Sequence, residues 1–111
     1  MAVYSDLSID QGTDFIAEVI VDDTDGTTAN LTGYTVAGQI RKTYSSTTKV
    51  DFTCTVTDAA AGKISIALSN TQTQAMKAGR YVYDVEITKT STAYKTRVIE
   101  GQVTVTPGVT Q

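Results

Sequence analysis

The sequence contains no histidine, no tryptophan and a single cysteine, and these absences narrow the chemistry available to it. Without histidine, imidazole metal sites and catalytic triads with a histidine base are excluded. One cysteine cannot form a disulfide within the chain. A thiol nucleophile at Cys54 would also need a base, and no histidine is there to serve. Because Cys54 lies between Phe52 and Val56 in an apolar alternation, we interpret it as a small core residue.

Long apolar runs and targeting signals are also lacking. No stretch approaches the roughly 20 apolar residues of a membrane helix. The N-terminus has neither the basic nor the apolar part of a secretory signal, so we expect a protein kept in a cytoplasm until it joins a larger assembly. A net charge of −3 and a pI near 4.7 give no reason to expect nucleic acid or a membrane as partner. The 111 residues predict a single domain over residues 1–111.

The clearest pattern is the alternation after Gly79. Its apolar side is formed by Tyr81, Tyr83, Val85 and Ile87. The residues between them are mostly polar, which predicts a half-buried strand.

The polar segment just before this strand is too short for a major helix. We predict one or two helical turns there, with Ala75 and Met76 inward and an end at Gly79. A helical turn, a glycine and a strand opening on tyrosine resemble the corner of immunoglobulin-like sandwiches, where a tyrosine hydroxyl bonds to upstream backbone. Tyr81 is the first candidate for that role and Tyr83 the second.

Six further segments alternate in the same way. They are Leu7–Ile9, Asp14–Asp22, Tyr34–Lys42, Val50–Val56, Ile64–Leu68 and Tyr94–Thr106. Asp14–Asp22 is apolar on both faces, so we expect it to be central or covered by a neighbour on its second face. Gly38 predicts a bulge or a large side chain packed on bare backbone. The broken alternation at Val98 and Ile99, and again near Gly101, predicts a bulge in the last strand.

Seven strands with turn signals between them predict an all-β fold. We expect a seven-stranded antiparallel immunoglobulin-like β-sandwich with one short helical turn before the sixth strand. An up-and-down barrel is the competing layout, and the helical corner favours the sandwich.

Two clusters of carboxylates are candidate sites. Asp22, Asp23 and Asp25 before Gly26 resemble part of a calcium loop, but its other ligands are missing. We therefore predict no metal and no cofactor there, only a solvated turn. Asp84 and Glu86 alternate on an outer strand face, where paired carboxylates are usually solvated rather than catalytic. No catalytic residue is predicted.

Two tyrosines remain as candidate contact residues. Tyr44 and Tyr94 lie in or beside polar loops, so we expect them to be exposed. They could form a platform for a glycan, although ordinary use of tyrosine at interfaces is the alternative.

Several segments, taken in order, resemble one known group of proteins. They are Leu7–Phe15, Leu31–Thr35, Gln39–Lys42, Ala78–Val85 and Thr96–Pro107. The chain is similar to small immunoglobulin-like virion structural proteins of tailed bacteriophages, of the T4-like type found in cyanophages. It is more distantly similar to the N-terminal domain of phage baseplate upper proteins.

The resemblance implies a protein without enzymatic activity that decorates the capsid or belongs to the tail or baseplate. Its partners would be other virion proteins, and it would be assembled in the host cytoplasm. Because the sequence ends at Gln111, without the further domains of baseplate relatives, a small accessory protein is the expectation. A homo-oligomer is left open. The alternative is a host-surface glycan-binding module that uses Tyr44 and Tyr94. For an added partner strand, we expect Leu7–Ile9 or Val103–Val105 to be the edge.

Overall fold

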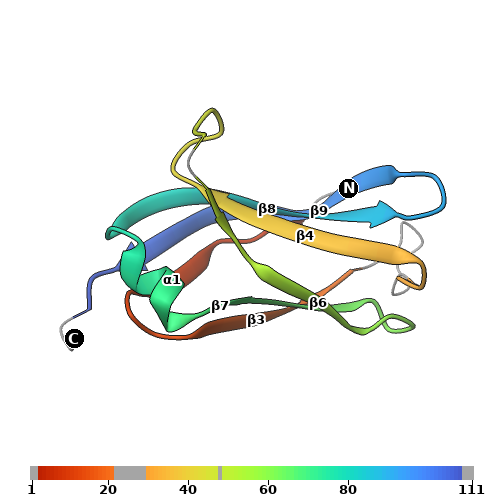
Figure 1. Cartoon of the computed structure of the whole chain (residues 1–111), viewed down its shortest axis with the longest axis horizontal. Helices are drawn as coiled ribbons and strands as arrows, with labels where there is room; N and C mark the ends of the chain where they lie inside the picture. The colour runs from red at the N-terminus through yellow and green to blue at the C-terminus, as the bar shows by residue number, and fades with distance from the viewer. Residues whose placement is uncertain (1–2, 22–29, 48, 109–111) are drawn as a thin grey trace.

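The chain folds into two β-sheets packed face to face, with one short helix at one end (Figure 1). The structure is a computed structural model that describes residues 3–21, 30–47 and 49–108. An all-β sandwich is therefore confirmed. Described residues form nine strands rather than the predicted seven, because the predicted segment Val50–Val56 is divided in two and a short strand at Val3–Tyr4 was not predicted.

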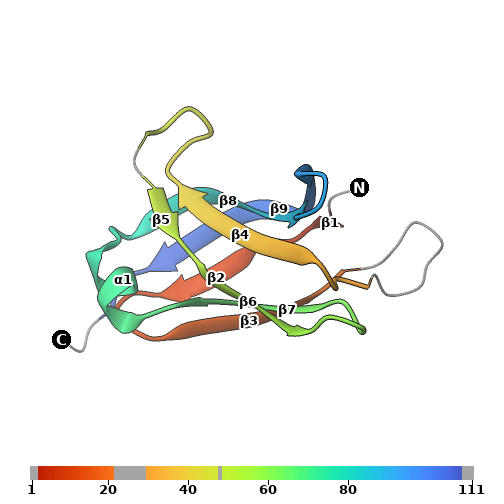
Figure 2. The same cartoon turned by 45° about the vertical axis from the view of Figure 1, so that its right-hand side comes forward.

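The larger sheet has six strands. They are β1 (Val3–Tyr4), β2 (Leu7–Asp10), β4 (Tyr34–Arg41), β5 (Lys49–Asp51), β8 (Gly79–Lys89) and β9 (Tyr94–Thr106). Their order is β1-β9-β8-β4-β5, and β2 also pairs with β9 (Figure 2). Both N-terminal strands run parallel to β9, so the prediction of a wholly antiparallel fold is corrected. Parallel pairing is available because almost the whole chain connects these strands.

The smaller sheet has three antiparallel strands, β3 (Phe15–Ile20), β6 (Thr53–Asp58) and β7 (Lys63–Leu68), in the order β3-β7-β6. The expectation that β3 is central or covered on its second face is wrong. Since the N-terminal strand pairs with β9, β3 has β7 as its one partner within the described part of the chain and lies at the edge. On its outer face Ile16 is 75% exposed and Ile20 is 50% exposed.

Phe52 marks the point where the chain passes from the larger sheet to the smaller one. Its N–H donates a 2.9 Å bond to the Gly38 carbonyl, and its side chain is buried. A Cβ on Gly38 would lie 3.1 Å from the Phe52 ring, so the expected large side chain on bare backbone is confirmed. β4 pairs with β8 in unbroken register through Gly38, so there is no bulge at this point.

The predicted bulge in the last strand is confirmed. Val85 pairs with Ile99, whereas the next residue of β8, Glu86, pairs with Arg97. Val98 is the extra residue, and both Val98 and Ile99 are buried. The bulge therefore explains how two consecutive apolar residues both leave the solvent.

Helix α1 spans Asn70–Ala75 and begins at a capping box. The Ser69 hydroxyl accepts from the Gln72 N–H, and the Gln72 side chain accepts from the Ser69 N–H. The spacing of serine and glutamine is a known start signal for a helix. The buried residue of the helix is Thr73, whose hydroxyl donates to the Thr13 carbonyl at 2.8 Å.

Two details of the predicted helical turn are corrected. Met76 is buried as expected, but Ala75 is exposed, because Thr73 takes the inward position of this short helix. The helix also ends at Met76, whose backbone is already extended, and not at Gly79. Gly79 instead opens β8 with φ of +146°, a conformation that disfavours other residues.

Candidate functional site

The corner tyrosine lies where β8 begins. The Tyr81 hydroxyl donates a 2.7 Å hydrogen bond to the carbonyl of Lys77, in the segment that follows α1. The Lys42 ammonium lies 4.7 Å from the centre of the Tyr81 ring. Tyr81 therefore ties the connection between α1 and β8 to the strand that follows it.

Tyr83 makes a different contact. Its ring is buried, meets the edge of the Phe52 ring, and directs its hydroxyl to the carbonyl of Ser5. Burial raises the pKa of Tyr83 to about 12. Tyr83 thus fixes the N-terminal segment to the larger sheet and is not the corner tyrosine.

The two predicted contact tyrosines are both exposed. Tyr44 is 71% exposed and Tyr94 is 68% exposed. Tyr44 follows β4 and lines a hollow on the outer face of the larger sheet, whereas Tyr94 begins β9 and is not among the residues that line it. The structure therefore does not bring the two together at this hollow.

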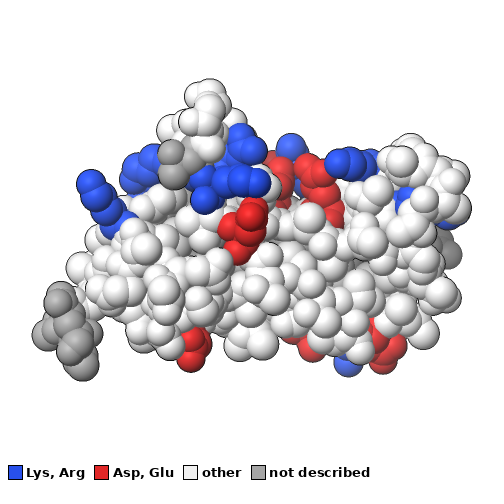
Figure 3. Space-filling model, viewed as in Figure 1, with Lys and Arg blue, Asp and Glu red and all other residues white. Residues whose placement is uncertain are grey.

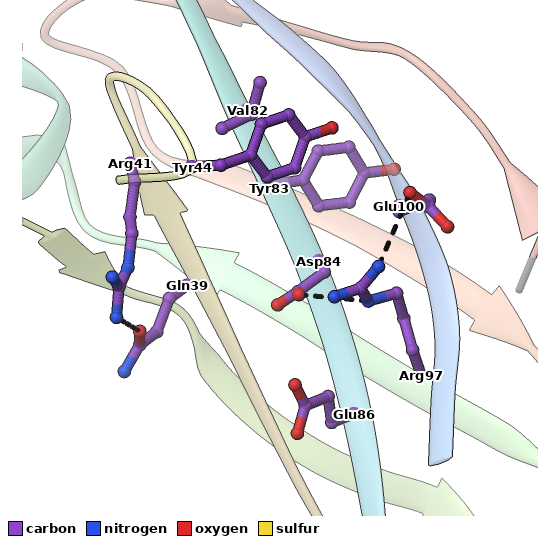
Figure 4. A pocket seen from close by; sticks show the side chains of 9 residues that line it. All are labelled: Gln39, Arg41, Tyr44, Val82, Tyr83, Asp84, Glu86, Arg97 and Glu100. Carbon is purple, nitrogen blue, oxygen red and sulfur yellow. Dashed lines mark hydrogen bonds and ion pairs between the residues drawn. The ribbon is translucent and has the colours of Figure 1, made fainter. Parts of the chain in front are cut away.

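The hollow lies across β4, β8 and β9 and has a volume of about 240 Å³ (Figure 4). It is lined by Gln39, Arg41, Tyr44, Val82, Tyr83, Asp84, Glu86, Arg97 and Glu100. The sequence predicted Tyr44 as a contact residue, Tyr83 as a corner residue and Asp84 with Glu86 as a solvated pair, but it did not bring these together in one site. Apart from Tyr44, which follows β4, and the buried Tyr83, the lining comes from outward positions of strands that are neighbours only in the folded sheet. No local motif marks these positions.

Charges of both signs meet in the hollow. Arg97 lies 3.2 Å from the Asp84 carboxylate and 3.7 Å from that of Glu100. Arg41 donates to the Gln39 side chain at 3.2 Å (Figure 4). Among the described residues, no ion pair involves Glu86. The site thus offers donors and acceptors without a strong charge of one sign.

A second surface covers the outer side of the smaller sheet, and we call it the β3 face. Pairing between the strands places three rows side by side. The rows are Ile16–Ala67–Thr53, Glu18–Ser65–Thr55 and Ile20–Lys63–Asp58. The face is rich in small and hydroxylated side chains and carries the two exposed isoleucines. In Figure 3, lysine and arginine gather over the larger sheet, and few charged atoms lie along the opposite side.

The predicted sites for strand addition have different outcomes. β2 pairs with β9 alone, so one side of Leu7–Ile9 stays without a partner strand among the described residues. Val103–Val105 pairs with β8 on one side and β2 on the other, so the prediction of a free edge there is wrong. The reason is that the N-terminal strand β2 pairs in parallel with β9 and occupies this edge.

Other predictions concern metal and membrane. The turn Asp22–Gly26 lies outside the described residues. Within residues 3–21, 30–47 and 49–108, no group of three or more potential metal ligands is found. No helix in those same ranges has the length and apolar character needed to cross a membrane.

The model of the family described as "LtfC-like, beta-sandwich domain" matches residues 2–106. The chain belongs to the LtfC-like family. That match spans both sheets and both surfaces described above. No curated protein sequence matches the LtfC-like chain.

Three solved structures are similar to this LtfC-like domain at low sequence identity. InlP of Listeria monocytogenes is 15% identical with a TM-score of 0.50, over 95% of this chain and 28% of that one. The NK cell receptor Nkp44 is 13% identical with a TM-score of 0.49, over 96% of this chain and 99% of that one. A family 123 glycoside hydrolase from Clostridium perfringens is 10% identical with a TM-score of 0.42, over 97% of this chain and 24% of that one. The chain spans about a quarter of InlP, and the likeness to InlP shows the fold alone.

Proposed function

We propose that this LtfC-like domain is a non-enzymatic docking component of a larger assembly and that it docks through the β3 face. The observation that carries the proposal is the exposure of Ile16 and Ile20, at 75% and 50%, on one face of the smaller sheet. Both side chains stand on the same side of β3, two rows apart. The two isoleucines flank Glu18, so they give a partner two separate apolar anchors on one sheet surface.

The energetics favour a partner on this face. Fully burying an isoleucine side chain contributes about 1.5–3 kcal/mol relative to leaving it in water. The neighbouring threonine, serine and alanine side chains are small, so a partner can approach the backbone closely. Little charge has to be desolvated, because the three rows contain only Glu18, Lys63 and Asp58.

We propose further that the assembly is the virion of a tailed bacteriophage, with other virion proteins as partners on the capsid, tail or baseplate. The support is the ordered likeness of five segments to small phage structural proteins, together with membership of a β-sandwich family. Phage particles lacking the protein, mixed with purified protein, test the assignment by electron cryomicroscopy. Regular added density on the capsid or on the tail supports it and locates the docking site. Particles without added density contradict it.

A second function has one observation in its favour, namely Tyr44 at the polar hollow. An exposed aromatic ring beside Arg41, Gln39 and Glu86 offers stacking, donors and acceptors to a neutral hydroxylated ligand such as a glycan. Alanine at Tyr44 would then remove retention of the protein on immobilised glycans. Tyr94→Ala is the matched control, because Tyr94 is as exposed but lies outside the hollow.

A further inference from the structure

The free edge of β3 is the most specific feature of the docking surface. β3 pairs with β7 on one side and with no other strand of the described chain on the other side. The Val21 N–H donates to the Gly62 carbonyl at 2.8 Å, which continues the β3–β7 ladder past the end of the strand. Alternate residues of an antiparallel strand direct their N–H and C=O groups to the same side. The groups of Val19 and Ala17 therefore point to β7, and those of Ile16, Glu18 and Ile20 point to the free edge.

The same three residues carry the exposed side chains of the β3 face. Ile16 and Ile20 flank Glu18, whose carboxylate forms no ion pair with any described residue. Its cross-strand neighbour on β7 is Ser65, which offers no charge. The edge thus presents unpaired backbone groups together with the side-chain order apolar, acidic, apolar.

This order disfavours a second copy of the chain. If two β3 strands paired antiparallel with Ile16 opposite Ile20, the two Glu18 carboxylates would lie directly opposite each other. Like charges in that position are destabilising. Charged residues on an edge strand are a recognised means of preventing such self-association.

We propose that β3 accepts an extended segment of another protein as a fourth strand of the smaller sheet, with a lysine or arginine opposite Glu18 and apolar residues two positions to either side. Backbone hydrogen bonds to Ile16, Glu18 and Ile20 supply affinity, and the alternating side chains supply specificity. The basic residue complements the unpaired carboxylate, and the apolar ones extend the rows of Ile16 and Ile20. This inference rests on the proposed docking function and specifies its mode.

A short synthetic peptide in which isoleucine, lysine and isoleucine alternate with threonine is the probe. Its binding to the full chain is followed by amide hydrogen exchange. Strand addition slows exchange at Ile16, Glu18 and Ile20, while Ala17 and Val19 change little because they are already bonded to β7. N-methylation of the alternate peptide residues whose N–H groups face β3 abolishes binding. N-methylation of the residues between them does not. Binding that leaves the three edge amides unprotected, or that treats both methylated peptides alike, overturns the proposal.

The charge is tested with Glu18→Lys, an exposed substitution that leaves the β7 ladder in place. We expect it to weaken binding of the lysine peptide roughly threefold to tenfold. A peptide with glutamate in place of the central lysine should restore the lost binding affinity when it is paired with the Glu18→Lys variant. If affinity changes neither with the charge at position 18 nor with the charge of the peptide, the proposed specificity is wrong.

The failure of this inference is separable from failure of the proposed function. Particle docking that needs Ile16 and Ile20, without peptide binding, leaves docking intact and rejects strand addition. Absence of both rejects both.

Discussion

The Tyr81 hydroxyl lies 2.7 Å from the carbonyl oxygen of Lys77, to which it donates a hydrogen bond. This single bond connects the first part of β8 to the segment that follows α1. It belongs to an exposed part of the molecule, so water competes for both groups.

Removing that hydroxyl should have a modest cost. We expect Tyr81→Phe to lower the free energy of unfolding by about 0.5–1.5 kcal/mol, the usual net contribution of one hydrogen bond. The ring and its contact with Lys42 remain. Urea denaturation measures the effect. Tyr94→Phe, on an exposed ring whose hydroxyl bonds to none of the described residues, should leave the midpoint unchanged. Equal midpoints for both variants would contradict a stabilising corner.

The backbone of Ser5 passes so close to Gly101 that a side chain at position 101 has no room. A Cβ at this position would clash with the Ser5 carbonyl oxygen, the same oxygen that accepts from Tyr83. Alanine must therefore push the N-terminal segment away from β9. We expect Gly101→Ala to destabilise the fold by about 1–3 kcal/mol, as overpacking does.

The matched control for that variant is Thr104→Ala, on an exposed position of the same strand. It should cost far less in the same denaturation experiment. A Gly101→Ala protein as stable as the control would show that the N-terminal segment does not cross at this point.

Tyr83 predicts how stability responds to alkaline pH. Its pKa is raised from the ordinary 10 to about 12, mainly by burial. The folded state therefore favours the neutral phenol, and this contribution is fully present below pH 10. As pH rises from about 10 to 12, the unfolded chain loses the proton first, so stability falls across that window.

A spectroscopic titration of tyrosinate checks the assignment. One tyrosine should ionise near pH 12, and that step should be missing in Tyr83→Phe. If the step missing from the variant is instead one near the ordinary tyrosine pKa of 10, Tyr83 is not buried as described.

Local chemistry was enough to predict several elements. The alternation through Tyr83 and Val85 gave β8 its inward face, and the doublet Val98–Ile99 located the bulge. Gly38 predicted the space that the Phe52 ring fills. Each of these depends on side-chain size and period within one strand, which the sequence states directly.

Pairing between distant strands was not predictable in the same way. Two apolar faces on β3 indicated burial, but Ile16 and Ile20 are exposed because the N-terminal strand pairs with β9 instead. The same choice buries Val103 in the sheet interior and removes a predicted free edge. The hollow beside Tyr44 likewise depends on the order of β4, β8 and β9 in the sheet, which no spacing along the chain encodes.

Retention of a double variant on particles tests the central claim most directly. Threonine at both Ile16 and Ile20 keeps a good strand former on an exposed face while removing the apolar contact. Sedimentation of phage particles lacking the protein, mixed with wild type, the double variant or a Tyr94→Thr control, measures docking. We expect wild type and control to co-sediment and the double variant to stay in the supernatant. Full retention of the folded double variant would contradict docking through the β3 face.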